Sequence, residues 1–118
     1  MPTPPRAVPP LTSPPDAVVR PPGSKSLTNR ALLCAALAQG TSRLSGVLLA
    51  DDTRAMLGAV AALGADVALD EDARVAVVTG ADPRQLRDGV TVDARQSGTT
   101  SRFLLPALAL APVACRLD

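Results

Sequence analysis

The sequence contains no histidine, tryptophan or tyrosine, and Phe103 is its single aromatic residue. The absence of histidine excludes histidine-based catalytic triads, histidine general bases and histidine-ligated metal sites. Aromatic side chains usually supply much of the buried area of a core, so a core made mostly of Ala, Leu and Val is thin. We therefore expect these 118 residues to form one small domain, or part of a larger one, with little stability of its own.

Strong net charge and membrane-spanning segments are also missing. The formal net charge is +1, from 12 basic and 11 acidic residues, which predicts neither a nucleic-acid partner nor an anionic membrane. The longest apolar run, residues 103–115, is too short to span a membrane and is interrupted by proline. No signal peptide is recognisable. We expect a cytoplasmic protein.

The two cysteines, Cys34 and Cys115, stand apart in apolar surroundings without CxxC spacing. This pattern favours two reduced thiols in the core over a disulfide or a metal site. We therefore expect no metal.

Proline and glycine divide the chain into an arm and an α/β body. Residues 1–15 are rich in proline and predict a disordered or polyproline arm. Residues 16–118 form the body, whose order βαβαββ followed by βα is typical of an α/β fold. Strands are predicted at residues 17–20, 41–49, 66–70, 74–80 and 90–94, the third and fourth as a hairpin, and helices at 27–39, 52–63 and 97–110.

Local signals set the ends of the predicted helices. Gly40 and Gly64 end the first two, and Asp51 or Asp52 caps the second. Pro106 should kink or shorten the third helix.

A weak internal repeat aligns RALLCA, which starts at Arg30, with RFLLPA, which starts at Arg102. Each arginine lies just inside a predicted helix, after a loop that contains Gly and Ser or Thr. Helices rich in small residues often resemble one another by chance, so duplication and coincidence both stay open.

The stretch PPGSKSLTNRALL, residues 21–33, places cations and hydroxyls at a predicted helix start. A helix start has unpaired backbone N–H groups and a partial positive charge, which suit an anion. Ser26 and Arg30 share one face, with Lys25 at the mouth. The alternative is that Ser24 is an ordinary cap and the cations are solvated. Basic residues are disfavoured at helix starts, which favours an anion site.

The third predicted helix repeats this arrangement with Gly98, Thr99 and Arg102. A nucleotide-binding P-loop is a rival interpretation of GSKS. It fails because Ser24, not glycine, precedes Lys25, and because the earlier glycine of that motif is missing.

PGSKSLTNRALL, then DDTRAML, then SGTTSR, in that order, closely resemble the 5-enolpyruvylshikimate-3-phosphate synthase (3-phosphoshikimate 1-carboxyvinyltransferase) family. The resemblance runs from residue 18 to residue 118. A sister family that transfers enolpyruvate to a UDP-sugar has a different lysine loop and fits less well.

The resemblance implies a fold of two domains, each built from three βαβαββ units in an inverse α/β barrel-like arrangement. The present sequence corresponds to one unit and the start of the next, an incomplete fold. The resemblance also implies an activity. This is transfer of the enolpyruvyl group of phosphoenolpyruvate to the 5-hydroxyl of shikimate 3-phosphate, with release of phosphate, in the shikimate pathway to chorismate and aromatic amino acids. It further implies no cofactor and a monomer at full length.

Site residues are carried over one at a time. By resemblance, Lys25 is the lysine that touches both substrates, and Ser26 and Arg30 bind shikimate 3-phosphate. Gly98 is the glycine whose backbone lies against phosphoenolpyruvate.

Other matching positions have supporting roles by resemblance. Thr99 and Arg102 are substrate-site candidates that shape the helix start rather than perform chemistry. Asp52 is expected to be a helix cap, and Arg54 a member of a structural pair.

The sequence departs from the family pattern at Arg95-Gln96, where Gly-Asn is usual, and this bears on phosphoenolpyruvate binding and on sensitivity to the inhibitor glyphosate. Phe103 stands just behind the site, where side-chain size matters.

Family members are several times longer, and no carboxylate here matches their general base. We expect these residues alone to be inactive. The alternative is a non-catalytic anion-binding fragment.

Overall fold

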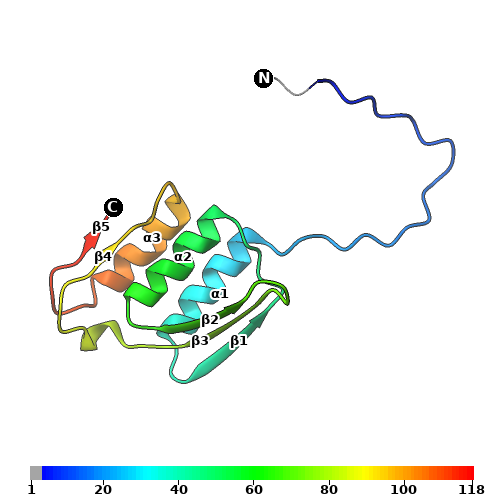
Figure 1. The fold of residues 1–118 in the computed structure, drawn as a ribbon. Coiled ribbons are helices and arrows are strands. Elements are labelled where there is room, and N and C mark those ends of the chain that lie inside the picture. Colours follow the sequence, from blue (N-terminus) through cyan, green and yellow to red (C-terminus); the bar gives the residue numbers. More distant parts are fainter. Residues whose placement is uncertain (1–3) are drawn as a thin grey trace.

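The computed structural model describes residues 4–118 and has three helices and two small sheets (Figure 1). The α/β prediction is confirmed. The elements are α1 (Lys25–Leu37), β1 (Thr41–Ser45), α2 (Asp51–Ala62), β2 (Asp66–Asp70), β3 (Val75–Thr79), a 3-10 turn η1 (Pro83–Gln85), β4 (Thr91–Val92), α3 (Gly98–Leu108) and β5 (Arg116–Leu117).

The larger sheet has the order β1-β3-β2, and the central strand β3 is antiparallel to both neighbours. Val77 of β3 is paired with Arg43 of β1 on one side and with Ala68 of β2 on the other. The Asp70 carboxylate accepts a 2.9 Å hydrogen bond from the Ala73 N–H and closes the turn between β2 and β3. The predicted hairpin is therefore confirmed.

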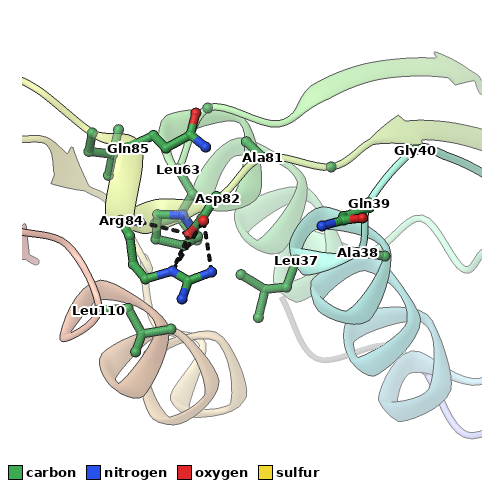
Figure 2. A pocket seen from close by; sticks show the side chains of 14 residues that line it. Leu37, Ala38, Gln39, Gly40, Leu63, Ala81, Asp82, Arg84, Gln85 and Leu110 are labelled. Carbon is green, nitrogen blue, oxygen red and sulfur yellow. Dashed lines mark hydrogen bonds and ion pairs between the residues drawn. The ribbon is translucent and has the colours of Figure 1, made fainter.

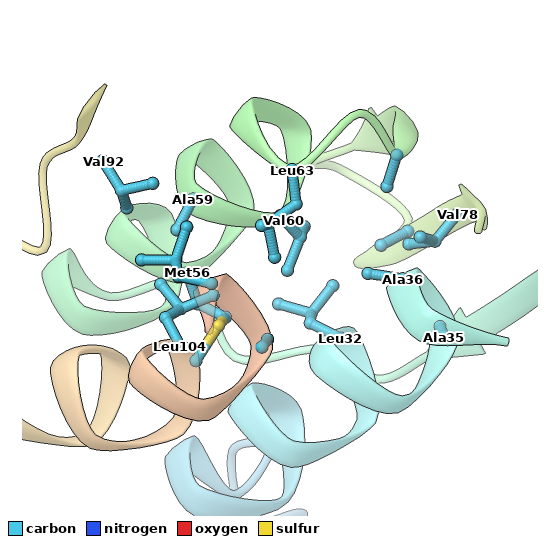
Figure 3. Packing of buried hydrophobic residues seen from close by; sticks show 14 of the residues in the cluster. Leu32, Ala35, Ala36, Met56, Ala59, Val60, Leu63, Val78, Val92 and Leu104 are labelled. Carbon is cyan, nitrogen blue, oxygen red and sulfur yellow. The ribbon is translucent and has the colours of Figure 1, made fainter. Parts of the chain in front are cut away.

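The core lies between the sheet and a layer of helices. Helices α1 and α2 contact the sheet, and α3 packs against α1 and α2 (Figure 1). Leu32, Met56 and Leu104, one from each helix, are fully buried and meet at the centre (Figure 3). Most other core positions are alanine or valine, so three larger side chains hold the helices together.

A second sheet forms from β4 and β5, which run parallel. Val92, opposite Leu117, is 1% exposed and belongs to the core cluster. The predicted strand over residues 90–94 is thus limited to two residues, and β5 was not predicted. Short, isolated strands of this kind have too little pattern to be recognised in a sequence.

The predicted strand at residues 17–20 is wrong. Residues 4–24 form no helix or strand, and the arm extends away from the body (Figure 1). Val18 and Val19 are 94% and 81% exposed. A strand needs a partner for its backbone groups, and within residues 4–118 none lies beside this segment. The described body therefore lacks the first strand of the predicted βαβαββ order, and residues 1–3 of the predicted arm lie outside the described residues.

Two smaller predictions are also corrected. Both cysteines are free. Cys34 is exposed on α1, so its predicted core location is wrong, whereas Cys115 is half-buried and packs against the core cluster. Cys34 stands on the face of α1 opposite the buried Leu32. Helix α3 continues through Pro106 and ends at Leu108, two residues earlier than predicted.

Within residues 4–118, no helix is both long and apolar enough to cross a membrane.

Candidate functional site

The start of α1 is set by Ser24. Its hydroxyl oxygen accepts a hydrogen bond from the Leu27 N–H (3.3 Å), and its carbonyl accepts one from the Thr28 N–H (2.9 Å). This capping starts the helix at Lys25, two residues before the predicted start. The cap uses the third and fourth N–H groups, so those of Lys25 and Ser26 stay outside it.

The loop before α1 is fixed on the segment that leads into α2. A Cβ on Gly23 would clash with the carbonyl oxygen of Gly46, so the close approach requires glycine. Inside α1, the buried Thr28 side chain accepts a 3.1 Å hydrogen bond from the Leu48 N–H. These contacts fix the position of Lys25 relative to α2.

The start of α2 supplies the partner of Lys25. The Lys25 Nζ lies 2.7 Å from a carboxylate oxygen of Asp52. The predicted cap by Asp51 or Asp52 is wrong, because Ala50 is the N-cap residue and the side chain of Thr53, inside the first turn, bonds to its backbone. The Thr53 hydroxyl accepts a hydrogen bond from the Ala50 N–H (2.8 Å) and donates one to the Ala50 carbonyl (2.9 Å). The Asp52 side chain is thereby free to pair with Lys25.

The start of α3 meets the same point. Ser97 caps α3 by accepting a 3.2 Å hydrogen bond from the Thr100 N–H, and the Thr100 hydroxyl donates to Ser97 Oγ at 2.8 Å. Thr100 Oγ1 also lies 3.4 Å from the Asp52 carbonyl oxygen. Asp52 therefore touches α1 through its side chain and α3 through its backbone, and the three helices begin at one end of the body (Figure 1).

The predicted residues of α1 surround this end and are accessible. Lys25, Ser26 and Arg30 are all exposed. Three helix starts contribute partial positive charge here. Arg30 adds a full side-chain charge, and Lys25 adds one that Asp52 partly offsets. Chemically, the arrangement suits a phosphate or a carboxylate.

The predicted residues of α3 are brought only partly into this group. Gly98 is exposed and Thr99 is half-buried, both in the first turn. Arg102 is exposed on the same face as Gly98, away from the buried Leu104. Within residues 4–118 the Arg102 side chain forms no ion pair.

Gly98 has no structural need to be glycine. A Cβ added there would meet nothing within 4 Å, and its φ is not in the left-handed region. Gly58 in α2 is equally unconfined, so open space alone does not identify a site. The difference is that Gly98 lies in a capped first turn, where an anion can approach the backbone.

Asn29 is a buried residue of this end that sequence reasoning missed. It is 0% exposed, and neither its amide nitrogen nor its amide oxygen has a hydrogen-bond partner within the described residues 4–118. Viewed down the axis of α1, Asn29 lies between Lys25, which faces α2, and Arg30, which faces α3. The only sequence signal was an asparagine one turn before the buried Leu32.

Arg30 makes a contact that sequence reasoning also missed. Its guanidinium carbon lies 5.9 Å from the ring centroid of Phe103 in α3. Phe103 is half-buried and packs against the core.

Arg54 forms the predicted structural pair, with Glu71 as its partner. Two hydrogen bonds of 2.9 and 2.8 Å join the guanidinium to the two carboxylate oxygens. The hydrogen bonds and the charge of Arg54 lower the pKa of Glu71. The same hydrogen bonds and the charge of Glu71 raise the pKa of Arg54. The pair connects α2 to the turn of the hairpin.

Arg95 occupies a strained backbone position. Its φ of +53° lies in the left-handed region, which favours glycine. The Asp93 carboxylate accepts a 2.7 Å hydrogen bond from the Arg95 N–H and supports the turn before α3. The departure from the family pattern thus falls where the backbone prefers the usual glycine.

A cavity of about 710 Å³ lies at the opposite end of the helices (Figure 2). The ends of α1 and α2 line it, and helix ends carry partial negative charge. Of the lining residues, Arg84 is the only cation, and three hydrogen bonds of 2.9 to 3.1 Å bind it to the Asp82 carboxylate. This cavity is therefore a poor anion site, despite its size.

Within residues 4–118, no three Cys, Asp or Glu side chains gather as metal ligands.

Comparisons with known proteins show the family of the chain. A family model described as EPSP synthase (3-phosphoshikimate 1-carboxyvinyltransferase) matches residues 12–118. A 3-phosphoshikimate 1-carboxyvinyltransferase of Rhizobium etli (strain CIAT 652) is 52% identical over 91 residues, which are 76% of this chain and 21% of that protein. A Pentafunctional AROM polypeptide of Komagataella phaffii is 46% identical over 94 residues, 79% of this chain and 6% of that protein.

The fold comparison gives the same answer. An EPSP synthase structure from Acinetobacter baumannii superposes with a TM-score of 0.70 at 25% identity, over 82% of this chain and 22% of that one. The chain spans about a fifth of the length of the single-enzyme relatives that it matches. The predicted family is confirmed: the chain belongs to the EPSP synthase (3-phosphoshikimate 1-carboxyvinyltransferase) family.

Proposed function

We propose that this chain forms part of the substrate site of an enzyme that transfers the enolpyruvyl group of phosphoenolpyruvate to the 5-hydroxyl of shikimate 3-phosphate and releases phosphate. The observation that carries the proposal is the exposed group of Lys25, Ser26 and Arg30 on a capped helix start that is fixed against α2 and α3. Family membership supports the choice of substrates.

Shikimate 3-phosphate binds through its anionic groups. Arg30 and Lys25 supply charge-assisted hydrogen bonds worth about 1.5–3 kcal/mol each, against about 0.3–1 kcal/mol for a helix start. The two cations therefore dominate affinity, and the Ser26 hydroxyl sets geometry. Because Lys25 is paired with Asp52, an anionic group of the substrate replaces the Asp52 carboxylate as the partner of the ammonium.

Phosphoenolpyruvate approaches the start of α3. Gly98 leaves open space beside the backbone, and the N–H groups of Gly98 and Thr99 lie outside the Ser97 cap. Lys25, in the first turn of α1 and paired with Asp52 of α2, is the residue that we propose to contact both substrates. Holding both reactants among fixed positive charges supplies proximity and offsets their repulsion.

The complete reaction needs groups beyond these. Asp52 is engaged with Lys25, and it is not placed as a free general base. The chain spans about a fifth of its relatives, and we propose that residues 1–118 alone do not turn over. For the complete protein we propose small-molecule substrates only, a monomeric state and a cytoplasmic location.

The test is shikimate 3-phosphate binding, measured by calorimetry, with phosphate release followed in parallel. Lys25→Ala should weaken binding about tenfold or more. Arg43→Ala is the control, because Arg43 is an exposed cation on β1, in the sheet. If the unmodified chain and Lys25→Ala bind shikimate 3-phosphate equally well, Lys25 is not a ligand of the substrate. Binding without phosphate release supports the incomplete site, and full turnover by the 118 residues would contradict it.

A second pair of variants tests the phosphoenolpyruvate side. Gly98→Ala fills open space in the first turn of α3, and Gly58→Ala makes the same change in α2. In the interior of α2, Gly58→Ala favours the helix by about 0.5–1 kcal/mol, and at both positions a Cβ meets nothing within 4 Å. Only Gly98→Ala should weaken phosphoenolpyruvate binding, and equal effects of the two would contradict the assignment.

A further inference from the structure

Phe103 and Arg30 form a contact between α3 and α1 at the candidate site. The guanidinium carbon of Arg30 lies 5.9 Å from the ring centroid, a distance at which the ring face attracts a cation. Phe103 itself is held, because it is half-buried against the core cluster that includes Leu104. The ring is thus a fixed platform and the arginine is the mobile partner.

Arg30 is held without being neutralised. The ion pairs within residues 4–118 involve Lys25, Arg54, Arg84 and Arg116, not Arg30. A carboxylate partner, such as Asp52 for Lys25, fixes a cation and also offsets its charge. An aromatic ring attracts the guanidinium through its face and leaves the N–H donors at the edge available.

We propose that Phe103 is a positioning residue: it holds the Arg30 guanidinium at the junction of α1 and α3, with charge and donors free for the phosphate of the substrate. This rests on the proposed function, because it takes Arg30 as an anion ligand. An exposed arginine has about 2 kcal/mol of side-chain entropy to lose when it is immobilised. Docking on the ring removes part of that cost before the substrate arrives.

The test is a double-mutant cycle on shikimate 3-phosphate binding. Phe103→Leu keeps an apolar side chain against the core and removes the ring face. It should weaken binding about two- to fivefold, and Arg30→Ala should weaken it more. Adding Phe103→Leu to Arg30→Ala should change nothing further, because the ring acts only through the arginine. Phe103→Trp, which restores a ring face, should recover binding.

The outcomes separate this proposal from the proposed function. If Arg30→Ala leaves binding unchanged, the assignment of Arg30 as a ligand fails. Suppose that Arg30→Ala weakens binding, and that Phe103→Leu weakens it equally in the unmodified chain and in Arg30→Ala. Phe103 is then merely structural, and the positioning role is overturned.

A measurement on the unmodified chain covers the case in which Phe103→Leu does not fold. The side-chain protons of Arg30 near the guanidinium should show NMR signals shifted upfield by the ring. The shift should persist when inorganic phosphate is added, because the ring does not occupy the N–H donors. Arginine signals at their ordinary positions would overturn the proposal.

Discussion

Lys25 and Asp52 form an ion pair of 2.7 Å between the first turns of two helices. The two side chains are 51% and 29% exposed, so water and solutes reach both charges. Exposed pairs of this kind contribute little stability, about 0–1 kcal/mol. The pair holds the ammonium in place and partly offsets its charge, which bears on the proposed binding of an anion.

Removing the competing charge should strengthen anion binding. Asp52→Asn leaves Lys25 unpaired, and we expect inorganic phosphate to bind about two- to fivefold more tightly at low salt, in line with the energy of an exposed pair. Calorimetry measures the change. Asp51→Asn is the matched control, since Asp51 lies in the same turn and forms no ion pair within residues 4–118. Weaker binding by Asp52→Asn would mean that Asp52 positions the lysine rather than competing for it.

The buried amide of Asn29 should be dispensable for folding. An unpartnered buried polar group costs about 1–3 kcal/mol, and an apolar group of similar size avoids that cost. Asn29→Leu should therefore leave the free energy of unfolding unchanged or raise it by about 1 kcal/mol, as measured by urea denaturation. Asn29→Asp should destabilise, because it buries a charge. A loss of stability in Asn29→Leu would show that the amide has a partner, such as an ordered water.

The left-handed backbone of Arg95 predicts a gain from glycine. An L-residue at φ +53° is strained, while glycine adopts this conformation freely. Arg95→Gly should be more stable than Arg95→Ala by about 0.5–1 kcal/mol. Alanine keeps the strain and removes the same side chain, so it is the proper reference. Equal stability of the two variants would contradict strain at this turn.

The Arg54–Glu71 pair predicts a loss of stability in acid. Arg54 lowers the pKa of Glu71 below its ordinary value of about 4.5. The contribution of the pair is therefore fully present above that pH, and it disappears as the pH falls through the lowered pKa of the folded state. Glu71→Gln should reduce the melting temperature slightly at neutral pH and not at all in strong acid.

Asp72→Asn, in the same turn, controls for charge alone. The change in melting temperature caused by Asp72→Asn should not follow the pH dependence seen for Glu71→Gln. A constant effect of Glu71→Gln from neutral pH into strong acid would contradict the pair as its cause.

The elements that could be predicted from the sequence are those with local signals. Ser24 is the N-cap of α1, and Gly40 follows shortly after its end at Leu37. The apolar alternation around residues 66–80 specifies a hairpin. The predicted strand at residues 17–20 failed because a strand depends on a partner that a local pattern does not reveal. β5 is too short to carry a pattern.

The candidate site divides in the same way. The cations at the start of α1 were recognised from the motif. Their partners were not: Asp52 and Phe103 come from other helices, and only the packing of α1 against α2 and α3 shows that they meet Lys25 and Arg30. The burial of Asn29 likewise depends on tertiary structure.

The most direct test of the central claim is an NMR titration of the isotopically labelled chain with shikimate 3-phosphate. The account predicts that backbone signals of residues 25–30 and 98–102 shift together, and that Lys25→Ala abolishes the response. Shifts confined to the cavity around Arg84, or no shifts at millimolar ligand, would contradict it.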